Sequence, residues 1–129
     1  MREILFKAKR VDDCKWVQGQ YVNYWHPNIR NATGHFIVEY PGTLHEIYTN
    51  TLCQYTGLTD KNGVKIFESD LMRFDNGEEE FSDYAVDWSN ASWKVACDDG
   101  SFPDNLDEFF SKRAEVIGNI HDKENDHEG

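Results

Sequence analysis

The sequence predicts a mainly β protein, in which many short strands form a small barrel or a twisted sheet and one short helix lies near the C-terminus. Two observations carry this prediction. The chain contains eight Phe, six Tyr and four Trp residues, and large planar side chains suit the half-buried surface of a sheet. Short apolar runs also alternate with turn residues, and a long helical period is nearly absent. Barrel closure would remove exposed strand edges, which are a hazard in an aromatic-rich β protein.

The first half of the chain is expected to hold five strands separated by turns. Asp12 and Asp13 supply the first turn. A loop rich in Pro and Asn, residues 24–34, separates the second strand from the third. Pro41 and Gly42 end the third strand. The expected strands cover residues 4–9, 15–23, 35–40, 46–48 and 52–55.

The second half is expected to hold five more strands and the helix. We expect the helix to run from residue 105 to about residue 113, with Asp104 as its N-cap because an aspartate accepts hydrogen bonds from free N–H groups. Leu106, Phe109 and Phe110 would form its one apolar face. The expected strands cover residues 64–67, 71–75, 84–88, 93–97 and 115–120.

A single domain is expected over residues 1–121, followed by a polar, disordered tail at residues 122–129. A chain of 129 residues can bury roughly two-thirds of its unfolded surface, so a core can form without disulfides or a metal. Its three cysteines are odd in number and form no CxxC pair, which indicates free thiols in a reducing compartment. No secretory signal or bilayer-spanning stretch is evident. We therefore expect a cytoplasmic protein.

Charge is distributed unevenly along the chain, whose formal net charge is −11. Residues 1–65 hold 8 Lys or Arg against 6 Asp or Glu, whereas residues 66–129 hold 5 against 18. An acidic half repels nucleic acid and anionic lipid and attracts basic protein surfaces. The same acids also keep a small protein soluble, so charge alone does not assign a partner.

An unbroken central segment, residues 54–71, is the most informative part of the chain. Asn62 followed by Gly63 favours a tight hairpin turn, because both residues adopt positive φ values readily. The carboxylates of Asp60 and Asp70 are suited to accept hydrogen bonds from nearby backbone N–H groups. We therefore assign a structural role to the turn residues Gly57, Asp60, Asn62, Gly63 and Asp70.

Three blocks of sequence, in this order and spacing, resemble the YopX family of small phage and prophage proteins. They are REILFKAKR at residues 2–10 with WVQG at 16–19, QYTGLTDKNGVKIFESDL at 54–71, and EVIGNIH at 115–121. The resemblance implies a compact β domain with an SH3-like, partly open barrel core and additional strands. It implies no reaction, because the family has no established activity or catalytic residues.

The chain departs from the family pattern at two turns. Ser69 stands where the pattern usually has Gly before the aspartate. Either this turn is relaxed or Ser69 tolerates its geometry, since only Gly enters the mirror regions freely. Ala8 replaces the usual Gly of the first block, and Asp12, Asp13 and Cys14 replace an Asp-Asn-Gly-like turn. These changes put the geometry of the first hairpin in question.

No pattern of side chains predicts catalysis or metal binding. The histidines have no HxH or HExxH spacing and none lies beside a cysteine. The acids of residues 75–83 do not follow the spacing of a calcium-binding loop. No nucleophile elbow, P-loop or dinucleotide fingerprint is present. We therefore expect a non-enzymatic protein with no catalytic residue, no metal and no cofactor.

The composite prediction is a phage or prophage accessory protein in the host cytoplasm that binds a host or phage protein through an acidic surface. The predicted partner-binding residues are Glu78, Glu79, Glu80, Asp83, Asp98, Asp99 and Trp93. One alternative is nucleic-acid binding through basic and aromatic residues of the N-terminal strands, namely Arg2, Lys7, Lys9, Arg10, Lys15, Phe6, Trp16 and Tyr21. The other is a DNA mimic whose carboxylates imitate phosphates. Self-association stays open, and no membrane partner is expected.

Overall fold

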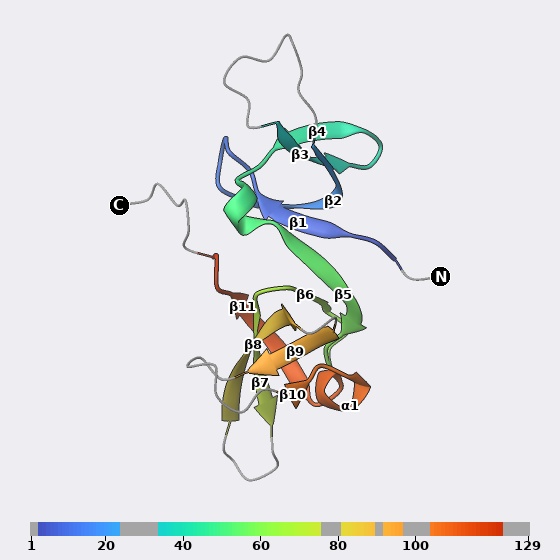
Figure 1. Ribbon diagram of the computed structural model, residues 1–129, viewed down its shortest axis with the longest axis vertical. Coiled ribbons are helices and arrows are strands. Elements are labelled where there is room, and N and C mark those ends of the chain that lie inside the picture. Colours follow the sequence, from blue (N-terminus) through green and yellow to red (C-terminus); the bar gives the residue numbers. More distant parts are fainter. Residues whose placement is uncertain (1–2, 24–33, 76–80, 90–91, 97–103, 123–129) are drawn as a thin grey trace. The chain divides into compact units, whose positions relative to one another are not determined.

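The computed structural model of the chain describes residues 3–23, 34–75, 81–89, 92–96 and 104–122 (Figure 1). Antiparallel strands dominate this part of the chain, so the prediction of a mainly β protein is confirmed. The chain divides into two compact units, of which the first runs to Gln54 and the second spans Tyr55–Asp122. The expectation of a single domain over residues 1–121 concerns cooperative folding, and it stays a prediction.

The first unit is built on an antiparallel sheet in which β4, β3, β2, β1 and the start of β5 lie in that order. The register places Lys7 opposite Gln18, and Ile37 opposite both Tyr21 and His45. A single bridge between Arg10 and Ile47 links the residues that follow β1 and β4. The elements are β1 (Phe6–Lys9), β2 (Trp16–Asn23), β3 (His35–Glu39), β4 (Thr43–Glu46), the 3₁₀ turn η1 (Thr49–Thr51) and β5 (Cys53–Thr59).

A small apolar core holds the first unit together. Its buried members are Ala8, Val17, Ile37 and Ile47, with Phe6, Tyr21 and Leu52 packed against them. Along β2, Val17 and Tyr21 alternate with the exposed Gln18 and Gln20, as expected for a strand with one buried face. The buried Thr51 hydroxyl accepts a hydrogen bond from Lys9 N at 2.8 Å and donates to Tyr48 O at 2.6 Å. The 3₁₀ turn is thereby fixed to the end of β1.

Gly19 allows β2 and β3 to approach closely. A Cβ atom at this position would lie 2.1 Å from the carbonyl oxygen of Val38 and 2.8 Å from its carbonyl carbon. Both atoms belong to the backbone, so they cannot move aside as a flexible side chain would. Any residue with a Cβ atom at position 19 would therefore clash with the backbone of β3.

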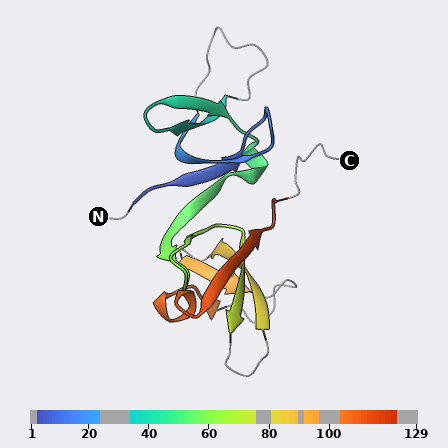
Figure 2. The same cartoon turned by 180° about the vertical axis from the view of Figure 1, so that it is seen from behind.

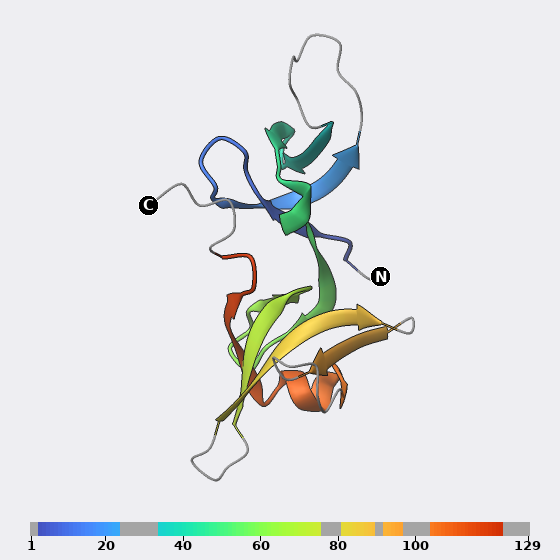
Figure 3. The same ribbon diagram turned by 60° about the vertical axis from the view of Figure 1, so that its left-hand side comes forward.

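The second unit contains a five-stranded antiparallel sheet in the order β10, β9, β8, β7, β11, together with the β5–β6 pair. Figure 2 shows β11 running beside β7. Figure 3 shows the helical turn α1 against the strands of this sheet. The elements are β6 (Lys65–Phe67), β7 (Asp70–Asp75), β8 (Phe81–Ser89), β9 (Ser92–Ala96), β10 (Asp104–Asn105), α1 (Glu108–Ser111) and β11 (Ala114–Asn119).

The core of the second unit is larger and more aromatic than that of the first. Phe110 of α1 stacks on Phe74, with ring centroids 5.0 Å apart, and forms a T-shaped pair with Tyr84, with centroids 5.3 Å apart. These pairs bring the helical turn onto the inner face of the sheet. The buried members are Ile66, Met72, Val86, Trp93, Val95, Leu106, Phe110 and Ala114.

The Asp60 carboxylate joins the β5–β6 turn to β11. Its Oδ1 accepts hydrogen bonds from Asn62 N at 2.8 Å and Val64 N at 2.9 Å, and its Oδ2 accepts from Val116 N at 2.8 Å. Lys61 N donates to Ala114 O at 3.0 Å. One buried side chain therefore closes the turn and also covers the outer edge of β11, whose main-chain groups would otherwise lack partners.

A second aspartate organises the turn between β6 and β7. Asp70, which is fully buried, accepts from Phe67 N at 2.7 Å and from Asn119 Nδ2 at 2.9 Å. Ser69 has a φ of 68°, and its N–H and C=O bond to Val86 O and Ile120 N. The sequence left open whether this turn is relaxed or whether Ser69 tolerates its geometry. The second explanation holds, because Ser69 adopts the left-handed conformation. Cys14 does the same in the first hairpin, with a φ of 59°.

Two expectations about architecture need correction. The described strands form two open antiparallel sheets and do not close into a barrel, and an SH3-like core is not confirmed. The predicted helix over residues 105–113 is wrong in extent, because only one turn forms and its N-cap is Asp107. Asp104 and Asn105 instead pair with Val95 and Lys94 of β9. Asp104 and Asn105, where the helix was expected to begin, are therefore part of the sheet.

Within the described residues, no helix has the length and apolar character that crossing a bilayer requires.

We expect Gly19→Ala to lower the free energy of unfolding of the first unit by about 2–3 kcal/mol, because the added methyl group overlaps the Val38 backbone. Urea unfolding monitored by circular dichroism measures this loss. Gly42→Ala is the matched control, since a Cβ atom there would meet no atom within 4 Å beyond its chain neighbours, and it should change stability by less than about 1 kcal/mol. Equal effects of the two substitutions would contradict the steric explanation.

We expect Asp60→Ala to destabilise the second unit by about 3 kcal/mol, because three main-chain donors lose a charged acceptor. Urea unfolding followed by tryptophan fluorescence measures this loss, since Trp93 lies in the core of the second unit. Lys61→Ala keeps the carboxylate and serves as the control. A loss below about 1 kcal/mol for Asp60→Ala would show that water replaces the carboxylate.

Candidate protein-interaction site

The acidic residues predicted to bind a partner are only partly covered by the structure. Glu78, Glu79, Glu80, Asp98 and Asp99 lie outside the described residues. Asp83 lies in β8, in register with Arg73 of β7, and Arg73 is also in register with Glu115 of β11. The backbone register therefore places Arg73 between two acidic residues of the neighbouring strands.

Trp93 belongs to the interior of the second unit. Only 9% of its surface is exposed, and its ring lies 4.8 Å from that of Trp88, its cross-strand neighbour, in an edge-to-face arrangement. Trp88 is 47% exposed. Of this aromatic pair, Trp88 is the ring that a partner can reach, and Trp93 packs the core behind it.

The predicted turn residues lie together in the second unit. Gly57 and Gly63 have φ values of 92° and 80°, which Gly adopts at no steric cost. Asn62 reaches Glu115 with its side-chain amide at 3.5 Å. Asp60 and Asp70 are buried and bonded to main-chain N–H groups, as described above. None of these residues lines the cavity described below.

The basic residues of the N-terminal strands are largely engaged with their own neighbours. The ammonium group of Lys7 lies 4.7 Å from the centroid of the Trp16 ring, and that of Lys9 lies 5.9 Å from it. Lys9 is almost fully buried. Arg10 is paired with the carboxylate of Asp13. These cations therefore stabilise the first hairpin at the positions where nucleic acid would have to bind.

Histidine and cysteine side chains in the described residues do not form a metal-binding group. His35 Nδ1 bonds to the Tyr21 hydroxyl at 2.6 Å, and His45 Nε2 bonds to Glu39 Oε1 at 3.1 Å. Cys53 is buried and its thiol donates to Thr51 O. His26, His127 and Cys97 lie outside the described residues.

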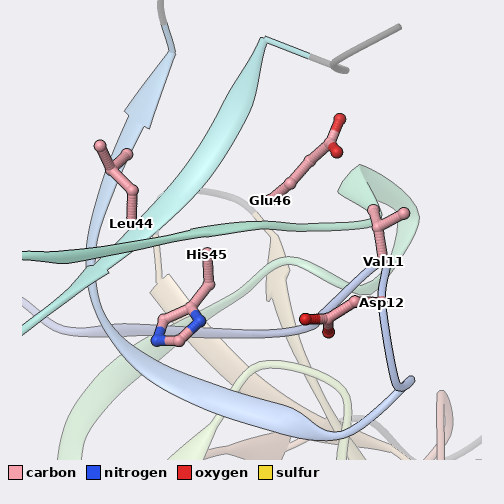
Figure 4. Close-up of a pocket in the computed structure, with 5 residues that line it drawn as sticks. All are labelled: Val11, Asp12, Leu44, His45 and Glu46. Atoms are coloured by element: carbon pink, nitrogen blue, oxygen red, sulfur yellow. The ribbon is translucent and has the colours of Figure 1, made fainter. Parts of the chain in front are cut away.

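A cavity of about 230 Å³ lies in the first unit, between the edge strand β4 and the turn that follows β1 (Figure 4). The imidazole of His45 and the carboxylate of Asp12 point toward a common space, whereas Leu44 and Glu46 project from the other side of the strand. The side chain of Asp12 is 77% exposed. The lining residues are Val11, Asp12, Leu44, His45 and Glu46.

The turn that carries Asp12 is held by its own hydrogen bonds. Asp13 accepts from Arg10 Nε at 2.9 Å and from Lys15 N at 3.0 Å. The hydrogen bond from the Arg10 guanidinium lowers the pKa of the Asp13 carboxyl, and the same bond raises the pKa of Arg10. Arg10 Nε lies 3.7 Å from Asp12 Oδ1. Arg10 is thus committed mainly to Asp13, which leaves Asp12 directed toward the cavity.

Acidic groups surround the open side of this hairpin. Asp12, Glu39 and Glu46 lie on or beside the cavity wall, and Arg10 is the nearby cation. Tyr40 and Leu44 lie on the same β3–β4 hairpin and are 93% and 45% exposed. The arrangement combines negative charge with exposed apolar side chains beside a strand edge. It can hold a cationic side chain without any chemical step.

This cavity was not predicted from the sequence. Asp12 was assigned to a turn, and His45 was one of the histidines considered for metal binding or acid–base chemistry. The clustering of Glu39, His45 and Glu46 around the turn at Pro41 and Gly42 indicates a polar hairpin with two acidic residues. That pattern says nothing about which strand lies at the edge of the sheet, because edge position depends on topology.

Comparisons with known proteins give a family match and a fold match. The family model described as YopX protein matches residues 5–125. The crystal structure of protein EF1440 from Enterococcus faecalis is similar with a TM-score of 0.54 and 22% sequence identity, covering 95% of this chain and 96% of that one. At this identity the likeness shows the fold alone. No curated protein matches the chain.

The Arg10–Asp13 pair gives the first hairpin a pH dependence of definite sign. Because the pKa of Asp13 is lower in the folded state, its contribution is present above the unfolded pKa, near 3.8, and is lost as pH falls through the folded pKa. We expect Asp13→Asn to lower the urea midpoint at pH 7, and this deficit should shrink as pH falls below about 4. Asp12→Asn is the control, since its 3.7 Å contact with Arg10 is longer. A deficit that grows on acidification would contradict this sign.

Proposed function

The chain belongs to the YopX family, and from this membership we propose that it is a phage or prophage accessory protein that binds another protein through an acidic surface. The carrying observation is the cavity beside β4, where Asp12 and Glu46 line the wall and Glu39 holds His45. A protein partner with a basic surface fits this chemistry. Its proposed setting is the cytoplasm of the bacterial host.

Charge supports a basic protein as the partner. The chain carries a formal net charge of −11, most of it in residues 66–129, which favours encounter with positively charged surfaces and opposes nucleic acid and anionic lipid. At the cavity itself the negative charge comes from Asp12, Glu39 and Glu46. The exposed apolar side chains of Tyr40 and Leu44 add contact area beside the acids. Aromatic and apolar anchors surrounded by charge are typical of protein–protein contacts.

The hydrogen bonds already made by the polar side chains favour a binding role over catalysis. His35 and His45 are held by Tyr21 and Glu39 in hydrogen bonds. Asp60 and Asp70 are buried and accept main-chain hydrogen bonds. A general base must reach a substrate proton, and each of these four groups already has a hydrogen-bond partner within the chain. The described residues thus offer a surface for recognition.

Nucleic-acid binding is the less favoured alternative, because phosphate contacts need accessible cations. Lys9 is buried and Arg10 is paired with Asp13. Lys7 lies over Trp16, so the ring that would stack on a base already has a partner. The DNA-mimic alternative falls within the same class as the proposal, since its target would also be a basic protein.

We expect the immobilised chain to capture a basic protein from bacterial cytoplasm, with binding that weakens as salt is added because the contact is electrostatic. The double variant Asp12→Asn with Glu46→Gln should lose most of this capture. Mass spectrometry identifies the captured protein and quantifies the loss.

The matched control is Asp87→Asn with Glu108→Gln, which removes the same charge from exposed positions of the second unit. This control should retain capture. A third variant, with Glu78, Glu79 and Glu80 changed to Gln and Asp83 to Asn, tests the acidic segment predicted from the sequence. If every variant captures as well as the unmodified chain, an acidic surface is not the basis of binding and the proposal fails. Salt-sensitive binding of single-stranded DNA would favour the nucleic-acid alternative instead.

A further inference from the structure

We propose that the open edge of β4 binds an extended, basic segment of the partner as an additional strand, with a Lys or Arg side chain of that segment in the cavity lined by Asp12 and His45. The inference rests on the proposed function and specifies how the same surface recognises its partner. Main-chain geometry, exposed side chains and charge each support it.

The register of the β3–β4 hairpin determines which main-chain groups point outward. Ile47 N donates to His35 O at 3.2 Å, so these two residues form a hydrogen-bonded pair. Hydrogen-bonded and non-hydrogen-bonded pairs alternate along antiparallel strands. Ile37 opposite His45 is therefore the next hydrogen-bonded pair. The N–H and C=O groups of Leu44 and Glu46 consequently face away from β3.

Contacts at Glu46 agree with this alternation. Its carbonyl oxygen accepts a hydrogen bond from Val11 N at 2.9 Å, on the side away from β3. Leu44 lies one repeat earlier on the same edge. Among the described residues, no hydrogen bond to the outward N–H or C=O of Leu44 is found. An added strand would meet both groups there, next to the turn that begins at Val11.

Side chains around this edge suit an extended segment. Leu44 and Tyr40 are exposed and offer apolar contacts. Side chains of an added strand would alternate between the two faces. Those on the face of His45 and Asp12 would enter the cavity (Figure 4). The cavity thus selects one side chain on that face of the bound segment.

Charge decides what kind of segment fits. Asp12 and Asp13 lie on the neighbouring turn, Glu46 lies on β4 and Glu39 lies on β3, and Arg10 is the accompanying cation. A second copy of β4 would bring its own Glu46 and Asp12 against these acids, which is unfavourable. A segment with Lys or Arg brings opposite charge instead. The observations therefore favour a basic partner over self-pairing.

The edges of the five-stranded sheet contrast with β4. The outer edge of β11 is covered at Ala114 and Val116 by Lys61 and Asp60. At the other end of that sheet, β10 has two residues. Short or covered edges are common means of preventing unwanted pairing. β4 carries no Pro or Lys, so its edge lacks these protective residues.

The experiment measures binding of a short synthetic peptide that alternates lysine with valine, by isothermal titration calorimetry with the full chain. We expect saturable binding. Two matched peptides separate the contributions: one carries N-methyl groups on alternate amides, which blocks main-chain pairing, and the other has glutamate in place of lysine. Each should bind about tenfold more weakly or not at all.

Variants of the chain provide an independent arm. Leu44→Pro removes the outward N–H and is compatible with an edge strand, whereas Leu44→Thr keeps the N–H and removes the apolar side chain. We expect Leu44→Pro to weaken peptide binding about tenfold relative to Leu44→Thr. Near-ultraviolet circular dichroism checks that both variants fold, and the N-methylated peptide tests the same contact if Leu44→Pro does not.

The outcomes distinguish this inference from the function on which it rests. Equal binding of the N-methylated and unmodified peptides, or no binding of the lysine peptide, overturns strand addition. If Asp12→Asn with Glu46→Gln abolishes capture of a basic protein while Leu44→Pro does not, the acidic surface stands and strand pairing fails. A concentration-dependent dimer that Leu44→Pro dissociates would assign the edge to a second copy and would also overturn the inference.

Discussion

Buried backbone groups must be hydrogen-bonded, and in the second unit aspartate side chains complete the pairing that short strands leave unfinished. Asp60 accepts three main-chain N–H groups, two within its own turn and one from β11. Asp70 connects the end of β6 to Asn119, and Asp107 caps the single helical turn. These three aspartates therefore act as hydrogen-bond acceptors for the chain's own backbone or side chains. Because their carboxylates are already bonded, recognition of a partner must depend on other acidic residues.

The same principle, applied to the first unit, identifies a place where pairing is incomplete. The Thr51 hydroxyl accepts a hydrogen bond from Lys9 N, and the Glu46 carbonyl accepts one from Val11 N. These main-chain N–H groups beside the bridge between Arg10 and Ile47 therefore have hydrogen-bond partners. At Leu44 the ladder ends without a partner on the outer side among the described residues. The fold and the proposed function thus depend on the same requirement. Where side chains hydrogen-bond to the outward main-chain groups of an edge strand, no further strand can pair there. Where those groups have no such partner, a strand of another protein can pair with them.

The sequence was a good guide to local geometry and a poor guide to topology. Asn62 and Gly63 predicted their turn because its chemistry is local, and the alternation in residues 15–23 predicted β2 for the same reason. The helix was overestimated because the apolar spacing of Leu106 and Phe110 fits a helix equally well, while pairing of Asp104 with Val95 depends on a distant strand. The geometry at Ser69 could not be decided from sequence, because its φ of 68° is imposed by Val86 and Ile120. The cavity beside β4 could not be predicted, since nothing in residues 43–46 indicates an edge.

Amide hydrogen exchange of the free protein, resolved by residue with NMR spectroscopy, tests the open edge of β4 most directly. We expect strong protection of Val64, Phe67 and Val116, whose N–H groups are bonded to aspartate carboxylates, and fast exchange of Leu44 beside a protected His45. Protection of the Leu44 amide equal to that of His45 would mean that the β4 edge already has a partner within the chain. That result would contradict both the open edge and the mode of binding built on it.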